Sequence, residues 1–315
     1  MDLNNKVAII TGSAQGLGKA FAARLLEVGV KVCISDLNKE KGEAALKELQ
    51  ERFGADKVCF VPCDVTKDEE FRNLFDKAEE YFKVGCVDIL GNNAGINTNY
   101  GWSKCMEVNI MAVMNGTEIA MERMKQVGKH GQIINTASLG KIKLESLMTN
   151  INFISAGFGP GVNPEMTSYT VSKHGVVQMT RTMALANDGI MHKAICPSWT
   201  DTAILTAAND NIPEKDKTAL RASIQEYGGL MTPEYVAEGF YRLLTQCGNG
   251  STMVVLKDTP YIQMPDYNKT CVMTLALVSK LVDKVLSPEI VMGHHLVVAL
   301  TLLFMIFCYL LTVIF

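Results

Sequence analysis

The chain has 315 residues, enough for one large α/β domain plus an appended segment. Apolar residues make up 48% and charged residues 20%, which excludes a disordered chain, and a net charge of −3 without a basic run excludes nucleic acid as the expected partner. The nine cysteines form no C-x-x-C pair and the five histidines do not cluster with them, so we expect neither a disulfide framework nor a metal site.

Short apolar runs rich in β-branched residues alternate with helical patterns along the chain. The runs predict strands at residues 6–11, 31–36, 57–62, 86–90, 132–137, 193–196 and, last, 252–257. Helices are expected between the first four strands and at about 104–126, 168–186 and 233–244, and a capping box from Thr66 to Glu69 is expected to open the third helix. Strands that are apolar on both faces indicate a doubly wound parallel α/β sheet of the Rossmann type.

A glycine-rich stretch, Thr11–Gly18, follows the first strand and opens the first helix. Gly12, Gly16 and Gly18 allow a tight turn and let the backbone approach a pyrophosphate, which the helix N-terminus stabilises. Asp36 ends the second strand, 18 residues after Gly18, where a carboxylate can accept a hydrogen bond from a ribose 2′-hydroxyl and repel a 2′-phosphate. The pattern therefore predicts a dinucleotide site that favours NAD over NADP.

Together with this loop, further motifs resemble the short-chain dehydrogenase/reductase family over about residues 6–267. They are "CDV" at 63–65, "NNAG" at 92–95, the Tyr169-x-x-x-Lys173 pair, and Asn109 in "VNI". The chain departs from the family at Ser198 and Gly91, where a glycine and a branched apolar residue are usual. The resemblance implies cofactor contacts from Gly12, Gln15, Gly16, Leu17, Gly18, Asp36, Leu37, Cys63, Asp64, Val65, Asn93, Ala94, Tyr169, Lys173, Thr200 and Thr202.

The resemblance also implies a catalytic set of Tyr169, Lys173, a serine and Asn109. Tyr169 and Lys173 are four residues apart and share a helix face, where an ammonium and an oxidised nicotinamide would lower the tyrosine pKa from its usual value near ~10. Tyr169 would then take the proton of a secondary alcohol while hydride passes to NAD. The serine would hold the substrate oxygen, and Asn109 would support a water chain to Lys173.

Two serines compete for the catalytic position. Ser138 ends the fifth predicted strand but precedes Tyr169 by 31 residues, a longer separation than the family shows, whereas Ser155 precedes it by 14. The stretch around Ser155 resembles a second copy of the strand-end segment, either a genuine insertion or two alternative exons joined. Lengthening a loop from roughly 13 to 30 residues costs about 0.7 kcal/mol, which favours Ser138 with an enlarged loop at 139–167. A protein that binds NAD without turnover is the remaining alternative.

The C-terminal residues 296–315 contain no charged side chain and would extend about 30 Å as a helix, the thickness of a bilayer core. We therefore expect a dehydrogenase domain at 1–267, a linker at 268–293 and a transmembrane helix at 294–315; a buried core helix is the alternative. This tail predicts anchoring in a membrane, which we expect to be the endoplasmic reticulum, with the catalytic domain in the cytosol.

The expected substrate is the secondary alcohol of an oxygenated fatty acid or a prostaglandin-like lipid, since a lipid substrate suits an anchored enzyme. A steroid or retinoid is the alternative substrate. The resemblance further suggests a homodimer formed through the helices at about 104–126 and 168–186.

Overall fold

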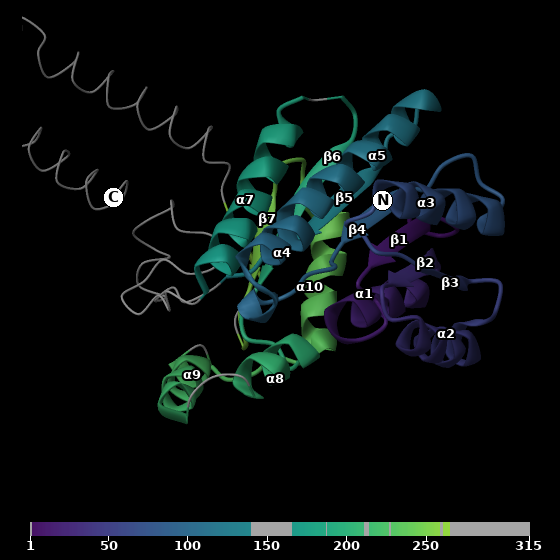
Figure 1. Ribbon diagram of the computed structural model, residues 1–315. Helices are drawn as coiled ribbons and strands as arrows, with labels where there is room; N and C mark the ends of the chain where they lie inside the picture. The colour runs from purple at the N-terminus through teal and green to yellow at the C-terminus, as the bar shows by residue number, and fades with distance from the viewer. Residues whose placement is uncertain are drawn as a thin grey trace, which may run out of the picture. The chain divides into compact units, whose positions relative to one another are not determined.

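A sheet of eight strands forms the centre of the described chain, with strand order β3-β2-β1-β4-β5-β6-β7-β8 (Figure 1). The structure is a computed structural model that describes residues 2–139, 166–186, 188–210, 214–226, 228–258 and 261–264. The parallel strands are β1 Val7–Thr11, β2 Lys31–Asp36, β3 Val58–Pro62, β4 Ile89–Asn92, β5 Gln132–Thr136, β6 Met191–Pro197 and β7 Thr252–Val255. β8, Ile262–Met264, runs antiparallel to β7. The predicted doubly wound sheet is confirmed, with an additional antiparallel edge strand.

Helices cover both faces of this sheet (Figure 1). They are α1 Gly16–Glu27, α2 Lys39–Phe53, α3 Asp68–Phe82, α4 Trp102–Met106, α5 Ala112–Gln126, α7 Thr167–Ala184, α8 Ala203–Asp210, α9 Glu214–Glu226 and α10 Pro233–Gln246. A short 3₁₀ helix, Thr98–Tyr100, precedes α4, and a π-helical turn, Glu107–Met111, joins α4 to α5. The sequence did not predict α8 and α9, which follow β6.

Alternate residues of strand β1 face opposite sides of the sheet and belong to two separate hydrophobic cores. Ala8 and Ile10 face the core that contains α1, α2 and α10, while Val7 and Ile9 face the core that contains α3 and α5. Both faces are buried, as expected of a parallel sheet covered on each side. On the first face, the rings of Phe21 in α1 and Phe240 in α10 stack with centroids 4.4 Å apart.

The unusual Gly91 in β4 has a packing reason. A Cβ added at this position would lie 2.6 Å from Cδ1 of Ile10 and 3.6 Å from Cζ of Phe240. The space that a branched side chain occupies in relatives is therefore taken here by neighbouring core side chains. This departure from the family is compensated inside the core and leaves the strand in register with β1 and β5.

Two local predictions were wrong. The expected capping box at the start of α3 does not form, because the hydroxyl of Thr66 donates to the carboxylate of Asp64 at 2.7 Å, and Glu70, not Glu69, accepts the backbone N–H of Asp64. Strand β4 begins three residues later than predicted. The backbone of Asp88 still bonds to Val7 and Gln132, and its carboxylate additionally accepts the N–H of Val7, so a side chain takes part in the pairing just before Ile89.

The strand order positions the site. Between β1 and β4 the order reverses, and ligands of open α/β sheets bind at the carboxyl ends of the strands at such a point. The glycine-rich stretch follows β1 and "NNAG" overlaps the end of β4, so both predicted cofactor motifs meet at this reversal.

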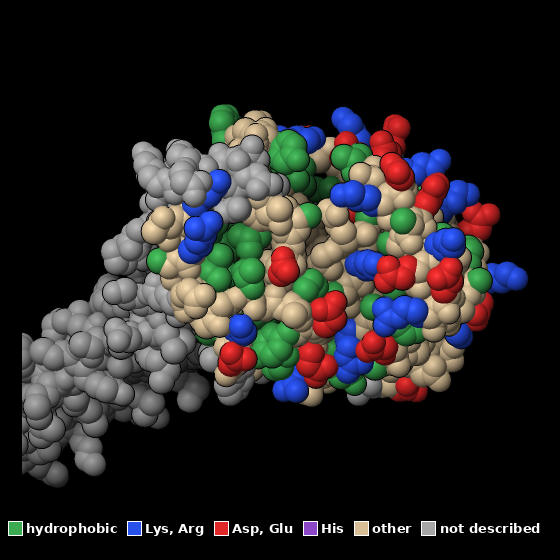
Figure 2. All heavy atoms as spheres, turned by 90° about the horizontal axis from the view of Figure 1, so that it is seen from below, with side chains coloured by type: hydrophobic (Ala, Val, Ile, Leu, Met, Phe, Trp, Pro, Cys, Tyr) green, Lys and Arg blue, Asp and Glu red, His purple; other side chains and the backbone are tan. Residues whose placement is uncertain are grey.

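The surface of the described unit is mixed in charge. Seen from below the view of Figure 1, basic and acidic side chains interleave without a continuous basic area (Figure 2). This face gives no support to a nucleic-acid partner. Within the described residues, no helix has the length and apolar character needed to cross a bilayer. The predicted linker and anchor at 268–315 lie outside the described residues, so the anchor and its membrane remain predictions.

Candidate active site

The glycine-rich loop is built by close backbone contacts. Gly12 and Gly16 have φ angles of +61° and +57°, which glycine adopts without strain. A Cβ on Gly12 would lie 2.7 Å from Cα of Ala94, and one on Gly18 would lie 2.3 Å from the carbonyl oxygen of Gly12. Each of the three positions therefore requires glycine for conformation or for space.

The N-terminus of α1 is open to an anion. Its N-cap residue, Gln15, makes no side-chain capping bond and instead accepts a hydrogen bond from Nζ of Lys41, and the first turn carries no acidic residue. Free N–H groups and the helix dipole favour negative charge at such an end. These features fit the pyrophosphate of a dinucleotide. Leu17, in the same turn, packs against the core.

Asn93, the residue after β4, supports the glycine-rich loop through hydrogen bonds. Its side-chain amide donates to the carbonyl oxygens of Thr11 and Gly12 at 3.1 and 3.0 Å, and the hydroxyl of Thr11 accepts the N–H groups of Asn93 and Ala94. Asn93 and Ala94 were predicted to line the cofactor site. In the structure they hold the glycine loop in place, and their contact with the cofactor stays a prediction.

Asp36 lies beside the loop at the end of β2. Its carboxylate accepts the N–H of Ala14 at 3.1 Å and of Asn38 at 3.0 Å, and its carbonyl accepts the N–H of Cys63. The last bond brings the "CDV" turn against the end of β2. Hydrogen bonds from Thr66 hold the pKa of Asp64 below its usual value against the opposing effect of burial. Leu37 is 72% exposed and Val65 packs on the second core.

A second loop, after β6, faces the glycine loop. A Cβ on Gly16 would lie 3.5 Å from Cγ2 of Thr202, so the two loops are in contact distance. The hydroxyl of Thr202 donates to the carbonyl of Thr200, and that of Thr200 donates to the carbonyl of Ser198. Thr200 and Thr202 therefore close the site from the side opposite to "NNAG".

The structure brings Ser138, Tyr169 and Lys173 together. Tyr169 and Lys173 lie on α7, with the lysine Nζ 5.8 Å from the centroid of the tyrosine ring. Ser138 follows β5, and its hydroxyl forms a side-chain hydrogen bond with Tyr169. The buried Nζ of Lys173 donates to the carbonyl of Thr136 at 2.8 Å. The end of β5 therefore positions the serine directly and the lysine through Thr136, both close to the tyrosine.

Burial governs the ionisation of this pair. Burial raises the pKa of Tyr169, the hydrogen bond with Ser138 lowers it, and Cys105 raises it. Burial also lowers the pKa of Lys173 to about 8. In the chain without NAD, removal of the phenolate from water is the larger effect. The predicted lowering of the Tyr169 pKa by the ammonium together with an oxidised nicotinamide stays a prediction, because it concerns the complex with the cofactor.

Asn109 sits in the π-helical turn between α4 and α5 and is fully buried. Its amide group accepts the N–H of Ile96 and donates to the carbonyl of Ile96, each at 2.8 Å, and it also donates to Ser172 Oγ at 3.3 Å. An added Cβ on Gly95 would lie 3.3 Å from both Asn109 Oδ1 and Lys173 Nζ. The predicted helix asparagine thus reaches the lysine end of the site, and π turns are frequent at such places.

The alternative serine, Ser155, and most of the enlarged connection, 140–165, fall outside the described residues. Within the described chain no group of metal-ligating side chains occurs, and each described cysteine is a free thiol.

The sequence did not single out two hydrogen-bond partners at this site, the carbonyl of Thr136 and the hydroxyl of Ser172. It also gave no role to the buried hydroxyl of Ser198, for which the described residues supply no hydrogen-bond partner. A backbone carbonyl has no residue-type signal. Ser172 lies next to Lys173 in the sequence, but nothing in the pattern marks it. Ser198 had a signal, since it replaces a usual glycine.

Comparisons with known proteins agree with this geometry. A family model described as short chain dehydrogenase matches residues 6–149 and 144–213, two segments that meet inside the enlarged connection. The chain is 34% identical over 280 residues to 15-hydroxyprostaglandin dehydrogenase [NAD(+)] of Homo sapiens, covering 86% of this chain and 97% of the relative. It is 37% identical over 213 residues to 3beta-hydroxysteroid dehydrogenase 2 of Eggerthella lenta, covering 64% and 74%.

Solved structures share the fold. A 3-ketoacyl-(acyl-carrier-protein) reductase from Brucella melitensis, complexed with NADH, has a TM-score of 0.63 at 25% identity, covering 81% of this chain and 98% of that chain. The crystal structure of gox2181 has a TM-score of 0.62 at 27% identity, covering 77% and 89%.

Proposed function

Because the chain belongs to the short-chain dehydrogenase family and is an NAD(P)-dependent dehydrogenase of that family, we propose that it oxidises the secondary alcohol of an oxygenated fatty acid or prostaglandin-like lipid with NAD. The observation that carries this proposal is the hydrogen bond of Ser138 with Tyr169, one helical turn from the buried Lys173. Identity to 15-hydroxyprostaglandin dehydrogenases over most of both chains supports the lipid alcohol.

The choice of NAD rests on Asp36. Its carboxylate ends β2 beside the glycine loop and would accept a bond from a ribose 2′-hydroxyl, while a 2′-phosphate would meet like charge. The uncapped N-terminus of α1 and the loop glycines would hold the pyrophosphate. Bound NAD supplies the hydride acceptor and, in its oxidised form, a positive charge.

The protein's own residues would manage the proton. Tyr169 takes the proton from the substrate hydroxyl, which requires the phenolate. Ser138 stabilises that phenolate by a hydrogen bond and is placed to bind the substrate oxygen as well. Lys173 carries positive charge at neutral pH, since its pKa is about 8, and favours the phenolate electrostatically. Asn109 supports the lysine end of the site through Ile96 and Ser172.

Purified protein with NAD and a panel of hydroxy fatty acids, prostaglandins, steroids and retinol tests this proposal. NADH formation with the oxygenated fatty acids or prostaglandins, abolished by Tyr169→Phe, is the expected result. A preference for steroids would favour the alternative substrate, which the identity to a 3beta-hydroxysteroid dehydrogenase supports. NAD binding by calorimetry without hydride transfer to any alcohol would instead indicate a protein that binds the cofactor without turnover.

A homodimer through the helices at about 104–126 and 168–186 is supported by exposed apolar side chains there. Met111 is 62% exposed, Met114 40% and Val171 51%. Exposed apolar groups grouped on helices often mark an interface. Sedimentation of the wild type and of Met114→Glu tests it: we expect a dimer that the charge dissociates, and a wild-type monomer would refute it.

A further inference from the structure

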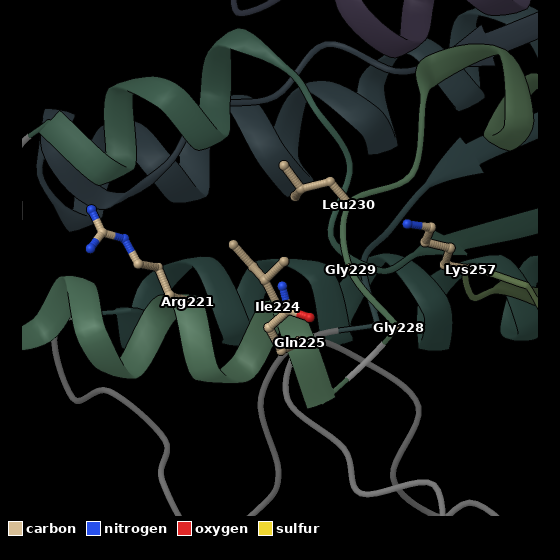
Figure 3. A pocket seen from close by; sticks show the side chains of 7 residues that line it. All are labelled: Arg221, Ile224, Gln225, Gly228, Gly229, Leu230 and Lys257. Atoms are coloured by element: carbon tan, nitrogen blue, oxygen red, sulfur yellow. The ribbon is translucent and has the colours of Figure 1, made fainter.

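A cavity of about 460 Å³ lies between α9 and the residues that follow β7. Its lining comprises Arg221, Ile224, Gln225, Gly228, Gly229, Leu230 and Lys257 (Figure 3). The α9 residues stand at positions i, i+3 and i+4, so one face of the helix supplies them. The volume lies within the usual range for small-molecule sites, which is about 300–1,000 Å³.

The end of α9 shapes this cavity. The N–H of Gly229 donates to the carbonyl of Ile224, and the N–H of Gly228 donates to that of Gln225, which together form a Schellman motif. Gly228 and Gly229 have φ angles of +83° and +99°, so the turn depends on glycine. A Cβ on Gly229 would lie 3.0 Å from Nζ of Lys257. The second glycine therefore leaves room for the lysine ammonium at the turn.

The polar groups of the cavity are cationic or neutral. Arg221 extends from α9 on one side and Lys257 lies across the turn on the other, with Ile224 and Leu230 between them (Figure 3). Among the described residues, no acidic side chain lines the cavity. Two cations beside apolar side chains match a ligand with an anionic group on an apolar body.

The cavity is connected to the loop that faces the glycine loop. Leu230 leads into Met231, whose N–H donates to the carbonyl of Trp199 and whose carbonyl accepts the N–H of Asp201. The indole N–H of Trp199 donates to Ser223 of α9 at 3.3 Å. The helix that carries Arg221 is therefore tied to the segment that contains Thr200.

We propose that this cavity binds an amphipathic hydroxy acid, with Arg221 and Lys257 at its two sides attracting the carboxylate and Ile224 and Leu230 between them receiving the adjoining chain. The inference deepens the proposed function, since it selects lipid alcohols that bear an acid over neutral steroids and retinol. Binding of the carboxylate at this cavity can be tested without turnover.

The kinetic test compares a hydroxy fatty acid with its methyl ester. For the acid, Arg221→Leu and Lys257→Met should each raise KM about 10- to 100-fold with kcat nearly unchanged, the loss expected for a charged hydrogen bond. For the ester, the KM of the variants should equal that of the wild type. A matched control, Lys47→Met, removes an exposed lysine of α2 and should change neither substrate. Equal KM values for the acid in the wild type and both variants would overturn the assignment.

A binding test keeps the site falsifiable if no alcohol is oxidised. Calorimetry with an unhydroxylated fatty acid below its critical micelle concentration should show binding to the wild type and to Lys47→Met. The affinity of Arg221→Leu and of Lys257→Met should be at least about 10-fold lower than that of the wild type. Undiminished binding in both cavity variants, or no binding to the wild type, would refute the site. Binding without turnover would refute the proposed function and leave the carboxylate site supported.

Discussion

Replacement of Ser138 by alanine removes the side-chain hydrogen bond to Tyr169 without changing the fold around it. The backbone on both sides of Ser138 is held to β6, because the N–H of Ala137 donates to Ile195 and that of Leu139 donates to Pro197. Ser138 itself is half-buried, so the substitution removes one hydroxyl and opens little space. The change should therefore act on the tyrosine and on the substrate oxygen.

The magnitude follows from the ionisation of Tyr169. A hydrogen bond to a charged group contributes about 1.5–3 kcal/mol, and each pKa unit corresponds to about 1.36 kcal/mol. Loss of the bond from Ser138 should raise the tyrosine pKa further. At a pH below that pKa the phenolate fraction, and with it kcat, should fall about 10- to 100-fold. The rising limb of the pH–rate profile should move to higher pH.

Initial rates of NADH formation across pH, for wild type, Ser138→Ala and Ser155→Ala, provide the assay. Ser155→Ala should retain the wild-type rate and profile, and NAD affinity measured by calorimetry should be similar in all three proteins. A Ser138→Ala protein with wild-type rate and an unshifted profile would refute the role of Ser138. If Ser155→Ala were instead the slow variant, the residue nearer in sequence would be the catalytic serine.

Other residues give independent tests. Asp36→Ala should raise the ratio of kcat/KM for NADP over NAD by about 10-fold or more, because the like charge is removed. Gly18→Ala should abolish detectable NAD binding in calorimetry, since its Cβ would lie 2.3 Å from the Gly12 carbonyl. NAD affinity should decline as pH rises above about 8, where Lys173 loses its proton, and Lys173→Met should remove that pH dependence. Lys193→Met should lower the free energy of unfolding by about 2–3 kcal/mol in urea titrations, because the buried Lys193 ammonium donates three hydrogen bonds that would be lost, while the pH–rate profile should not move.

The fold was predictable because its signals are periodic and repeated. The predicted parallel strands and most of the connecting helices occur close to their expected places, since two-sided apolar runs read clearly. Helices α8 and α9 were missed. Their sequences come after β6 as "TAILTAANDN" and "KDKTALRASIQ", two short segments without a long periodic apolar stripe. The cavity at the end of α9 could therefore not be predicted from the sequence.

The site was predictable as residue types and only partly as interactions. Glycine positions and the Tyr169–Lys173 spacing follow from geometry, so they could be named in advance. The effect of burial on the Tyr169 pKa could not, because it depends on how much of the ring leaves water. The hydrogen bonds from the Asn93 amide to the backbone of the glycine loop could not be named in advance either. Residue spacing predicts which helix face or strand end carries a side chain. It does not predict the hydrogen-bond partners of that side chain, which come from segments distant in the sequence.

The enlarged connection is expected to change the surroundings of the proposed catalytic residues more than those residues themselves. For Ser155 to serve, residues 151–154 would have to replace β5, yet Gln132–Thr136 is the segment paired with β4 and β6 in unbroken register. β5 ends with the carbonyl of Thr136 on Lys173 and with Ser138 bonded to Tyr169. Both ends of the connection are thus held beside the proposed catalytic residues. The two segments of the family match overlap inside the connection, at 144–149. Additional residues between two fixed ends add a small closure cost, so they are expected to alter which alcohols are accepted and not the proton and hydride transfer.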